Sequence, residues 1–295
     1  MGGAPTPDVY VQIPAYRDGE LSATLRDLYA RAVRPDRLRV RVLWQRGPSD
    51  AWDPSLAGLP HLEVEEWDHQ DSEGCNWARR RLQAQWRDEP YTVLLDSHHR
   101  FVDGWDELGI GMYEALRRSG VERPLLTAYL PPYDPADDPA GRDHRPFAIY
   151  PLEREGGILT RLTSYSIPRW QDRHAPVPAD FLSLHFVLTE GAFNRTVPLD
   201  AGVYFFGDEV LTGLRAFTHG YDLYHPHRVL GWHAYDRARR VTHWADHAGW
   251  REVHDRSLER LRSLFLDRAA SDPAFGTRRT VADYERHIVD DLVLR

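Results

Sequence analysis

The first 130 residues alternate between two patterns of hydrophobic and polar positions. Short apolar runs rich in β-branched residues, typical of buried strands, alternate with segments in which apolar residues recur every three or four positions, as on one face of a helix. This alternation predicts an α/β fold that opens like a nucleotide-binding domain. The predicted strands are Val9–Pro14, Leu38–Gln45, Leu62–Trp67, Tyr91–Leu95 and Leu125–Tyr129, and the predicted helices are Glu20–Ala32, Glu73–Trp86 and Trp105–Arg118.

The remainder of the chain is less regular. Two polar loops, 131–145 and 165–178, flank the short segments Phe147–Tyr150 and Gly157–Thr163, which predict a hairpin. No repeat, low-complexity tract or clear linker divides the chain, and its length makes one large α/β domain as likely as two. Further predicted strands are Phe181–Leu188 and Arg228–His233, and further predicted helices are Asp208–Thr218, Trp250–Asp267 and Val281–Leu294.

Polar residues follow the apolar strand Tyr91–Leu95 without a break, and Asp96, His98 and His99 are among the next four. In open α/β sheets ligands bind beyond the carboxyl ends of the strands, where these side chains are expected. Asp96 and His98 lie two positions apart on an extended segment and point the same way, which offers an oxygen and an imidazole nitrogen to a divalent cation. The alternative is a solvated turn in which Asp96 caps the helix that begins at Trp105, but a cap explains neither histidine.

Two adjacent acids, Asp208 and Glu209, begin a predicted helix directly after an aromatic run and Gly207. The helix dipole favours acids in a first turn, which is one explanation for them. The glycine would also let a ligand approach closely, and paired carboxylates suit hydrogen bonding to a hydroxyl-rich substrate. Both readings stay open from the residues alone.

Several histidines follow this helix, and His233 ends the predicted strand Arg228–His233. An imidazole at a strand end makes His233 the best candidate for a distant third metal ligand. His185 lies in the middle of the apolar run Phe181–Leu188, a position more typical of a buried core histidine, and is therefore not included in the site.

Composition narrows the possible functions. A formal net charge of −8 over 295 residues argues against a protein that coats nucleic acid, and every basic side chain other than histidine is arginine. The single cysteine excludes an internal disulfide and a Cys-rich zinc site. No apolar run of about 18 residues and no signal-like N-terminus is present, so we expect no membrane span and a cytoplasmic protein. The sequence leaves the oligomeric state open.

Five segments of the chain resemble a known family: VYVQIPAYRD, GCNWARRRLQAQW, DSHHRFVDGWDE, YFFGDEVLTGLRAFTHGYDLYHP and GWHAYDR. In this order and spacing they are similar to the GlcNAc-transferase family that includes the Skp1 hydroxyproline N-acetylglucosaminyltransferases, and the chain resembles a bacterial-type member. A more distant resemblance is to the polypeptide GalNAc-transferases, whose metal motif is also Asp-Ser-His.

This resemblance implies a GT-A glycosyltransferase fold, with a Rossmann-like central mixed sheet flanked by helices and a C-terminal helical extension. Residues 1–295 would form a single domain. Within it, 8–130 would bind the nucleotide-sugar and metal, 131–248 would bind the acceptor and contribute a closing loop, and 249–295 would form the C-terminal helices.

The resemblance also implies roles for individual residues. Asp96, His98 and His233 would ligate a divalent cation, Mn²⁺ in the first place and Mg²⁺ as the second choice. Asp208 and Glu209 occupy the family's Gly-Glu-Glu position and would be the catalytic acids; Asp replaces the first Glu, which leaves their division of labour open. The residues that would contact the UDP-sugar are Tyr16, Arg17, Asp18, Gln45, Arg79, Asp96 and Arg237.

The implied reaction moves a sugar, GlcNAc from UDP-GlcNAc, to a hydroxyl of a protein, peptide or small natural product, with retention of configuration. A divalent cation and arginine would neutralise the charge that develops on UDP as the bond to the anomeric carbon breaks. Two alternatives stay open. A metal-dependent hydrolase would use the Asp/His cluster to activate water without an acceptor, and a nucleotide-sugar-binding module would have lost catalysis.

Overall fold

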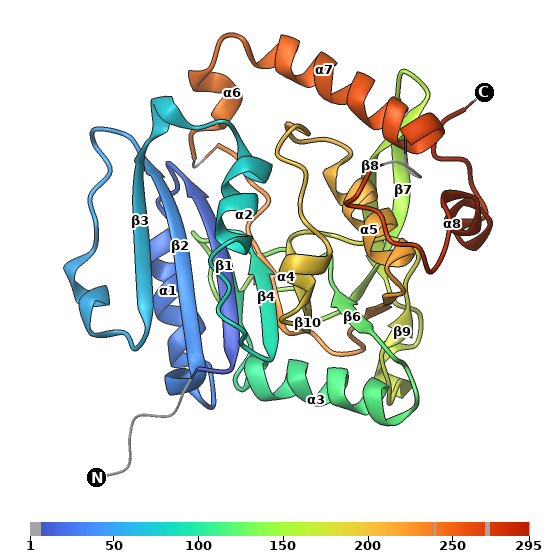
Figure 1. The fold of residues 1–295 in the computed structure, drawn as a ribbon. Helices are drawn as coiled ribbons and strands as arrows, with labels where there is room; N and C mark the ends of the chain where they lie inside the picture. Colours follow the sequence, from blue (N-terminus) through green and yellow to red (C-terminus); the bar gives the residue numbers. More distant parts are fainter. Residues whose placement is uncertain (1–6, 239, 269–271, 295) are drawn as a thin grey trace.

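The computed structural model describes residues 7–238, 240–268 and 272–294. Its centre is an eight-stranded mixed sheet (Figure 1), which confirms the predicted fold class. The strands are, in spatial order, β3 (Leu62–Asp68), β2 (Leu38–Arg46), β1 (Val9–Tyr16), β4 (Tyr91–Leu95), β10 (Phe186–Glu190), β6 (Pro124–Thr127), β11 (Asp222–His225) and β9 (Val177–Pro178). The first four are parallel, and β10 lies antiparallel between β4 and β6.

Helices cover both faces of the parallel part of the sheet, which explains why β1 is apolar and buried over nearly its whole length. Figure 1 shows α1 (Leu21–Ala30) behind the sheet and α2 (Cys75–Gln83) in front of it. Leu25 and Leu28 of α1 are fully buried, one turn apart on the face toward the strands.

Among the described residues, none of the helices combines the length and the apolar composition that a membrane span requires. Six further α-helices and several short helical turns complete the helical part of the described residues. They are α3 (Trp105–Arg118), α4 (Phe193–Thr196), α5 (Asp208–Thr218), α6 (His243–Asp246), α7 (Trp250–Ser263) and α8 (Val281–Ile288), with 3₁₀ turns at Pro35–Arg37, Pro54–Gly58, His69–Asp71 and Trp170–Asp172 and a π-helical turn at Leu264–Arg268.

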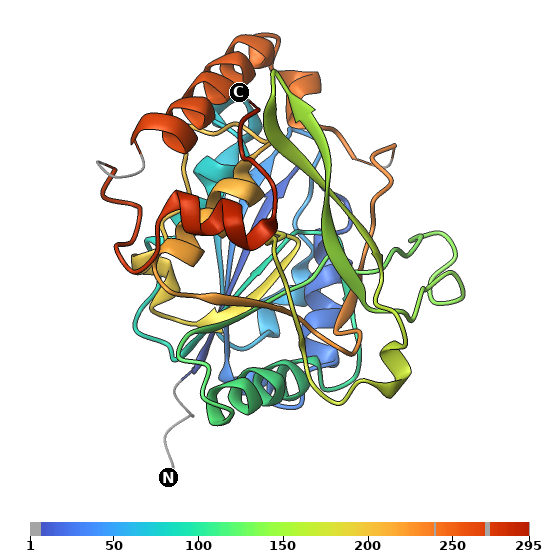
Figure 2. The same cartoon turned by 90° about the vertical axis from the view of Figure 1, so that its right-hand side faces the viewer.

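Two small sheets flank the central one. In the first, β5 (His99–Phe101) pairs antiparallel with β12 (Gly231–His233), and the register places His233 opposite His99. In the second, β7 (Phe147–Glu155) and β8 (Ile158–Ser166) form a long hairpin along one side of the molecule (Figure 2). The hairpin is longer than predicted, and its inner face packs against α5, α7 and α8 in a second hydrophobic core.

The predicted strand Phe181–Leu188 is wrong in its first half. The strand begins only at Phe186, and the preceding residues form a turn. Phe181, Leu182 and Leu184 are nevertheless buried, in two hydrophobic clusters. The apolar run therefore reports burial rather than extended structure.

The predicted C-terminal helix is too long. It ends at Ile288, because Val289 adopts a left-handed conformation with φ of 53°. The apolar residues beyond it pair with the hairpin, and Leu292 O accepts a hydrogen bond from Leu159 N at 2.9 Å. The helix predicted to Asp267 is α-helical to Ser263 and π-helical beyond it.

Two further predictions about local structure are wrong, and one strand was missed. Gly104, not Asp96, is the N-cap of α3, so the alternative role for Asp96 as a helix cap is wrong. The strand predicted over Arg228–His233 covers only its last three residues, in β12. Strand β11 was not predicted, because its four residues Asp222–His225 alternate too briefly to form a recognisable pattern.

Candidate active site

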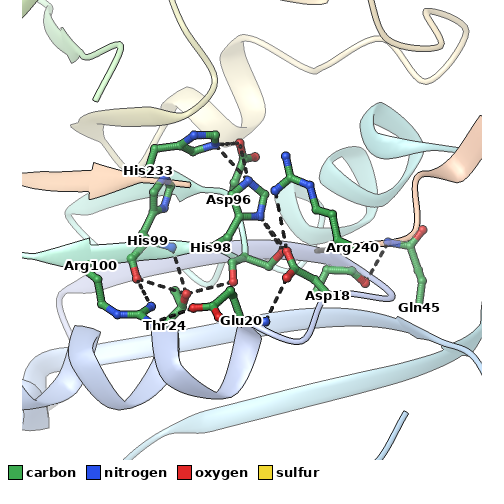
Figure 3. Close-up of polar contacts among 12 residues, drawn as sticks. Asp18, Glu20, Thr24, Gln45, Asp96, His98, His99, Arg100, His233 and Arg240 are labelled. Atoms are coloured by element: carbon green, nitrogen blue, oxygen red, sulfur yellow. Dashed lines mark hydrogen bonds and ion pairs between the residues drawn. The ribbon is translucent and has the colours of Figure 1, made fainter. Parts of the chain in front are cut away.

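Asp96, His98 and His233 converge at the carboxyl end of β4 (Figure 3). His98 Nε2 lies 2.9 Å from His233 Nε2, and His233 Nε2 lies 3.2 Å from Asp96 Oδ2. The pairing of β12 with β5 brings His233 to the other two residues, although it is 135 positions from His98. Such a cluster of one carboxylate oxygen and two imidazole nitrogens is a donor set that suits a divalent cation.

The bend that carries these side chains is fixed by Thr24 of α1. Its hydroxyl donates to the carbonyl of Ser97 at 2.9 Å and accepts a hydrogen bond from the backbone N–H of His99 at 2.9 Å. The chain between β4 and β5 is thereby held to the helix on which it rests. This explains why Asp96 and His98 leave the strand in a defined direction.

Asp18 contacts the ring nitrogen of His98 that faces away from His233. Its Oδ2 is 2.6 Å from His98 Nδ1 (Figure 3). Burial alone would raise the pKa of Asp18, but its hydrogen bonds with His98 and Ser97 hold it below the ordinary value. The Asp18 carboxylate therefore accepts a hydrogen bond from Nδ1–H, and Nε2 of His98 is left with its lone pair toward His233 and Asp96. This is the tautomer that a metal-ligating histidine requires.

Arg79 fixes the other oxygen of Asp96. Its Nη2 donates to Asp96 Oδ1 and to the carbonyl of Leu184, the latter at 3.2 Å. Burial alone would raise the pKa of Asp96, but the Arg79 guanidinium and His233 hold it well below the usual range. Asp96 is thus an anion with Oδ1 paired and Oδ2 directed at the histidine nitrogens.

A cavity of about 470 Å³ opens in front of this cluster. Tyr16 and Gln45, at the ends of β1 and β2, line it, and the side chain of Gln45 is held by Ser72 Oγ at 2.5 Å. Asp18 and Arg237, also predicted to contact a donor, line the same cavity. Arg17 does not line it; its guanidinium turns outward to Asp246.

The chain after β12, described at 234–238 and 240–248 and here called the crossing segment, lines this cavity and is tied to the opposite wall. Asp246 Oδ2 accepts hydrogen bonds from Tyr16 Oη at 2.7 Å and from Arg17 Nη1 at 2.9 Å. His243 lies 2.6 Å from Tyr204 Oη and 3.1 Å from the carbonyl oxygen of Ser72. Sequence analysis missed Asp246 and His243 as parts of the site, because their partners lie far away in the chain.

Two arginines of this crossing segment face the cavity. The guanidinium of Arg237 lies 5.7 Å from the ring centre of Phe205 and 5.1 Å from that of Trp244, and none of the described residues forms an ion pair with it. Burial, followed by the charge of Arg240, lowers the pKa of Arg237. Arg240 lies 4.0 Å from Asp18. The cavity is therefore lined by positive charge as well as by the Asp96, His98 and His233 cluster, an arrangement that suits an anionic ligand.

Asp208 and Glu209 line a second cavity of about 270 Å³ that shares Asp96 and His185 with the first. Burial raises the pKa of both acids, and the neighbouring charge of Asp208 raises that of Glu209 further. Asn76 Nδ2 donates to Asp208 Oδ2 at 3.1 Å. At least one of these acids therefore holds its proton at a higher pH than an exposed carboxyl group does.

The turn before β10 connects the acids to the Asp96 cluster. Glu209 Oε1 accepts hydrogen bonds from Ser183 Oγ and from Leu184 N, both at 2.8 Å, while the carbonyl of Leu184 receives Arg79. Ser183 and Leu184, two consecutive residues of this turn, thus contact both Glu209 and Arg79, the residue that orients Asp96.

His185, the next residue, is not among the residues of the metal-type cluster, but its predicted place in the strand is wrong. It is not in the middle of a strand but immediately before β10, and it lines both cavities. Its ring stacks on that of His233 with 4.3 Å between centres and 8° between planes. Burial lowers the pKa of His185 to about 4, so the ring is neutral at physiological pH.

A family model described as "Glycosyltransferase (GlcNAc)" matches residues 8–59 and 54–292. The match therefore covers nearly the whole chain, including every residue of the site. A search of curated proteins finds no match.

Solved structures share the fold at low sequence identity. A crystal structure of GalNAc-T7 with UDP, GalNAc and Mn²⁺ has a TM-score of 0.58 and 12% identity, over 96% of this chain and 55% of that one. TarS 1–349 of S. aureus in complex with UDP-GlcNAc has a TM-score of 0.53 and 10% identity, over 89% of this chain and 74% of that one. The chain thus spans about half the length of GalNAc-T7.

Proposed function

The chain belongs to the GlcNAc glycosyltransferase family, and on this premise we propose that it transfers N-acetylglucosamine from UDP-GlcNAc to a hydroxyl acceptor with the help of a divalent cation. The observation that carries the proposal is the convergence of Asp96, His98 and His233 at the wall of the larger cavity. The choice of donor is supported by the family and by the fold shared with a structure that holds UDP-GlcNAc.

The residues present fit a divalent cation. Asp96 Oδ2 and the Nε2 atoms of His98 and His233 would hold it, with Asp18 orienting His98 from behind. Mn²⁺ is the proposed ion, with Mg²⁺ as the second choice, because Mn²⁺ accepts imidazole more readily. When bound, the ion supplies positive charge to the diphosphate that leaves as the bond to the anomeric carbon breaks.

The protein's own side chains would place the rest of the donor. Tyr16 and Gln45 are proposed to lie against the uridine at the ends of β1 and β2. Arg237 and Arg240 face the cavity from the crossing segment, where they would neutralise phosphate oxygens. Arg17 and Arg79 act one step away: Arg17 holds the crossing segment through Asp246, and Arg79 orients Asp96.

Asp208 and Glu209 are proposed to bind and polarise the sugar and the acceptor hydroxyl in the second cavity. Glu209 is held by two hydrogen bonds to one oxygen, whereas Asp208 is oriented by Asn76. Retention of anomeric configuration is part of the proposal and is supported by the family resemblance alone. The acceptor class, a hydroxyl of a protein, a peptide or a small molecule, is supported in the same way.

We further propose that the chain works as one GT-A domain. In it, 8–130 carries the nucleotide and cation side, 131–248 carries the acceptor side and the crossing segment, and 249–295 supports them. The support is that β10 of the second part lies within the central sheet beside β4, so neither part completes that sheet alone.

The test is a donor panel. The protein is incubated with UDP-GlcNAc, UDP-GalNAc, UDP-glucose and UDP-galactose, with Mn²⁺ or with a chelator, and UDP release is followed together with UDP binding. Slow, Mn²⁺-dependent release that is fastest from UDP-GlcNAc supports the proposal. Absence of binding of any uridine nucleotide, with metal-dependent hydrolysis of another substrate class, would overturn it.

A further inference from the structure

His185 occupies the boundary between the two cavities, although nothing in the proposed chemistry uses it so far. Its ring lies between two others, at 4.3 Å from the ring centre of His233 and 4.6 Å from that of Tyr129. Its backbone follows the turn that holds Glu209 on one side and Arg79 on the other. Two aromatic rings and the backbone of this turn therefore hold the ring of His185 beside the cavities.

The hydrogen bonds of Tyr235 determine which nitrogen of His185 carries the proton. The Tyr235 hydroxyl lies 2.6 Å from the carbonyl oxygen of Leu130 and 3.4 Å from His185 Nδ1. A hydroxyl has a single hydrogen, and the short contact to the carbonyl uses it. We assign Nδ1–H of His185 as the donor in the longer contact, which places the lone pair of the ring on Nε2.

This lone pair has no protein partner. Among the described residues no group donates a hydrogen bond to His185 Nε2, and the atom is not sealed from solvent, in contrast to both ring nitrogens of His99, which are buried without a partner. His185 also does not join Asp96, His98 and His233 in the group whose donor atoms lie within 4.8 Å of one another. Nε2 is thus a hydrogen-bond acceptor offered to whatever occupies the cavities.

The position of the ring restricts what that occupant presents. If the cation cluster holds the diphosphate and the two acids face the acceptor, the transferred sugar lies between them, beside His185. A lone pair on a neutral imidazole pairs with a hydroxyl or an amide N–H, and not with a phosphate oxygen, which is itself an acceptor.

We propose that His185 Nε2 accepts a hydrogen bond from a hydroxyl or acetamido N–H of the transferred sugar and thereby selects the donor. The inference rests on the proposed function and adds to it a residue that determines specificity. A site built to accept a hydrogen bond rejects an analogue that lacks the donor group more strongly than a merely apolar pocket does.

Two variants separate the hydrogen bond from the packing. His185→Phe keeps an aromatic face against His233 but removes both nitrogens. His185→Gln loses the ring but places an amide oxygen near the position of Nε2. Each is assayed for kcat/KM with the preferred UDP-sugar and with analogues that lack one hydroxyl or the acetamido group, and for UDP affinity in the presence of Mn²⁺.

We expect wild type to discriminate against one analogue in particular. His185→Phe should lower kcat/KM for the intact donor by about 10- to 100-fold. For that analogue, the kcat/KM of the variant should be no lower than for the intact donor. The UDP affinity of the variant should stay within about twofold of wild type. His185→Gln should recover part of the discrimination. If His185→Phe and the loss of one group from the sugar are not additive in their effects on kcat/KM, that group is coupled to His185. A packing role does not produce such coupling.

Two results would overturn the inference while leaving the proposed function intact. In one, His185→Phe and every analogue lower kcat/KM independently, so that no group on the sugar is coupled to His185. In the other, UDP affinity falls in parallel with kcat/KM, which would mean that the ring only supports His233. If wild type neither binds nor turns over any UDP-sugar, the proposed function fails and this inference fails with it.

Discussion

Asp18 Oδ2 accepts a hydrogen bond from His98 Nδ1 across 2.6 Å, and this contact decides that Nε2, the nitrogen facing the candidate cation site, carries the lone pair. Asp18 stands in the loop after β1, and His98 follows β4, the neighbouring parallel strand. The tautomer of one residue is therefore set by the pairing of two strands.

Replacing Asp18 should weaken cation binding without unfolding the protein. Because loss of a carboxylate behind a metal-ligating histidine typically costs about 10- to 100-fold in metal affinity, we expect Asp18→Ala to lower Mn²⁺ affinity by that factor. Asp18→Asn should lower the Mn²⁺ affinity less, since its amide oxygen still accepts the hydrogen bond from His98 Nδ1. Calorimetric titration with Mn²⁺ measures both, with Glu20→Ala as the neighbouring control. Wild-type affinity in Asp18→Ala would contradict the assigned tautomer.

Asp246 holds the crossing segment to Tyr16 and Arg17, so Asp246→Ala should let bound UDP leave faster. We expect the dissociation rate to rise about 3- to 10-fold, measured by stopped-flow displacement. The free energy of unfolding should change by only about 0.2–1 kcal/mol, because the pair is partly exposed to water. Asp172→Ala, which breaks the exposed pair with Arg169, is the control. An unchanged dissociation rate would show that the segment does not retain the nucleotide.

Glu209 should make the protein less stable as the pH rises. Burial, followed by the charge of Asp208, raises the pKa of Glu209, so the folded state binds this proton more tightly than the unfolded state does. The contribution of Glu209 to the free energy of unfolding is therefore fully present below the ordinary carboxyl pKa of about 4. It is lost as the pH rises through the raised pKa of the folded protein.

Glu209→Gln tests this directly. The amide keeps an oxygen for Ser183 Oγ and Leu184 N but never ionises. We expect the variant to be inactive in transfer and yet more stable than wild type by about 1–2 kcal/mol at pH 8, with the difference vanishing near pH 4. Chemical denaturation at both pH values measures it. A variant that is less stable than wild type at pH 8 would contradict the raised pKa.

Gly207 is required by the backbone that places the acids. Its φ is 89°, and a Cβ there would clash with Leu261 Cδ1 of α7. Gly207→Ala should therefore lower the free energy of unfolding by about 1–3 kcal/mol. Gly111→Ala is the matched control, since nothing lies within 4 Å of its Cβ in α3, and it should raise stability by up to about 1 kcal/mol. Equal effects in urea unfolding would contradict this role of Gly207.

Local patterns predicted the parts of the fold and of the site that depend on neighbours in the chain. The strands of the first half are short apolar runs rich in β-branched residues, a pattern that is easily recognised. Asp96 and His98 directly follow one of these strands. The helix start at Asp208 was also correct, because an acidic first turn after a glycine is a local signal.

Contacts between distant segments could not be predicted in this way. His185 resembled a core residue because the residues around it are apolar, yet it lies in a turn whose Leu182 and Leu184 are buried, and it lines both cavities. Asp246 meets Tyr16 across 230 positions, and no feature of its own segment indicates that partner. Such pairings are decided by how β12 and the chain after it return to β1 and β4.

The most direct test of the account is UDP binding by calorimetry with Mn²⁺ and with a chelator, in wild type and His98→Ala. His98 is the better choice than Asp96, because removal of Asp96 also leaves the buried Arg79 unpaired. His174→Ala, at an exposed position, is the control. The account predicts Mn²⁺-dependent binding in wild type and in His174→Ala, and loss of that dependence in His98→Ala with an unchanged circular dichroism spectrum. Mn²⁺-dependent affinity that survives in His98→Ala would contradict the central claim.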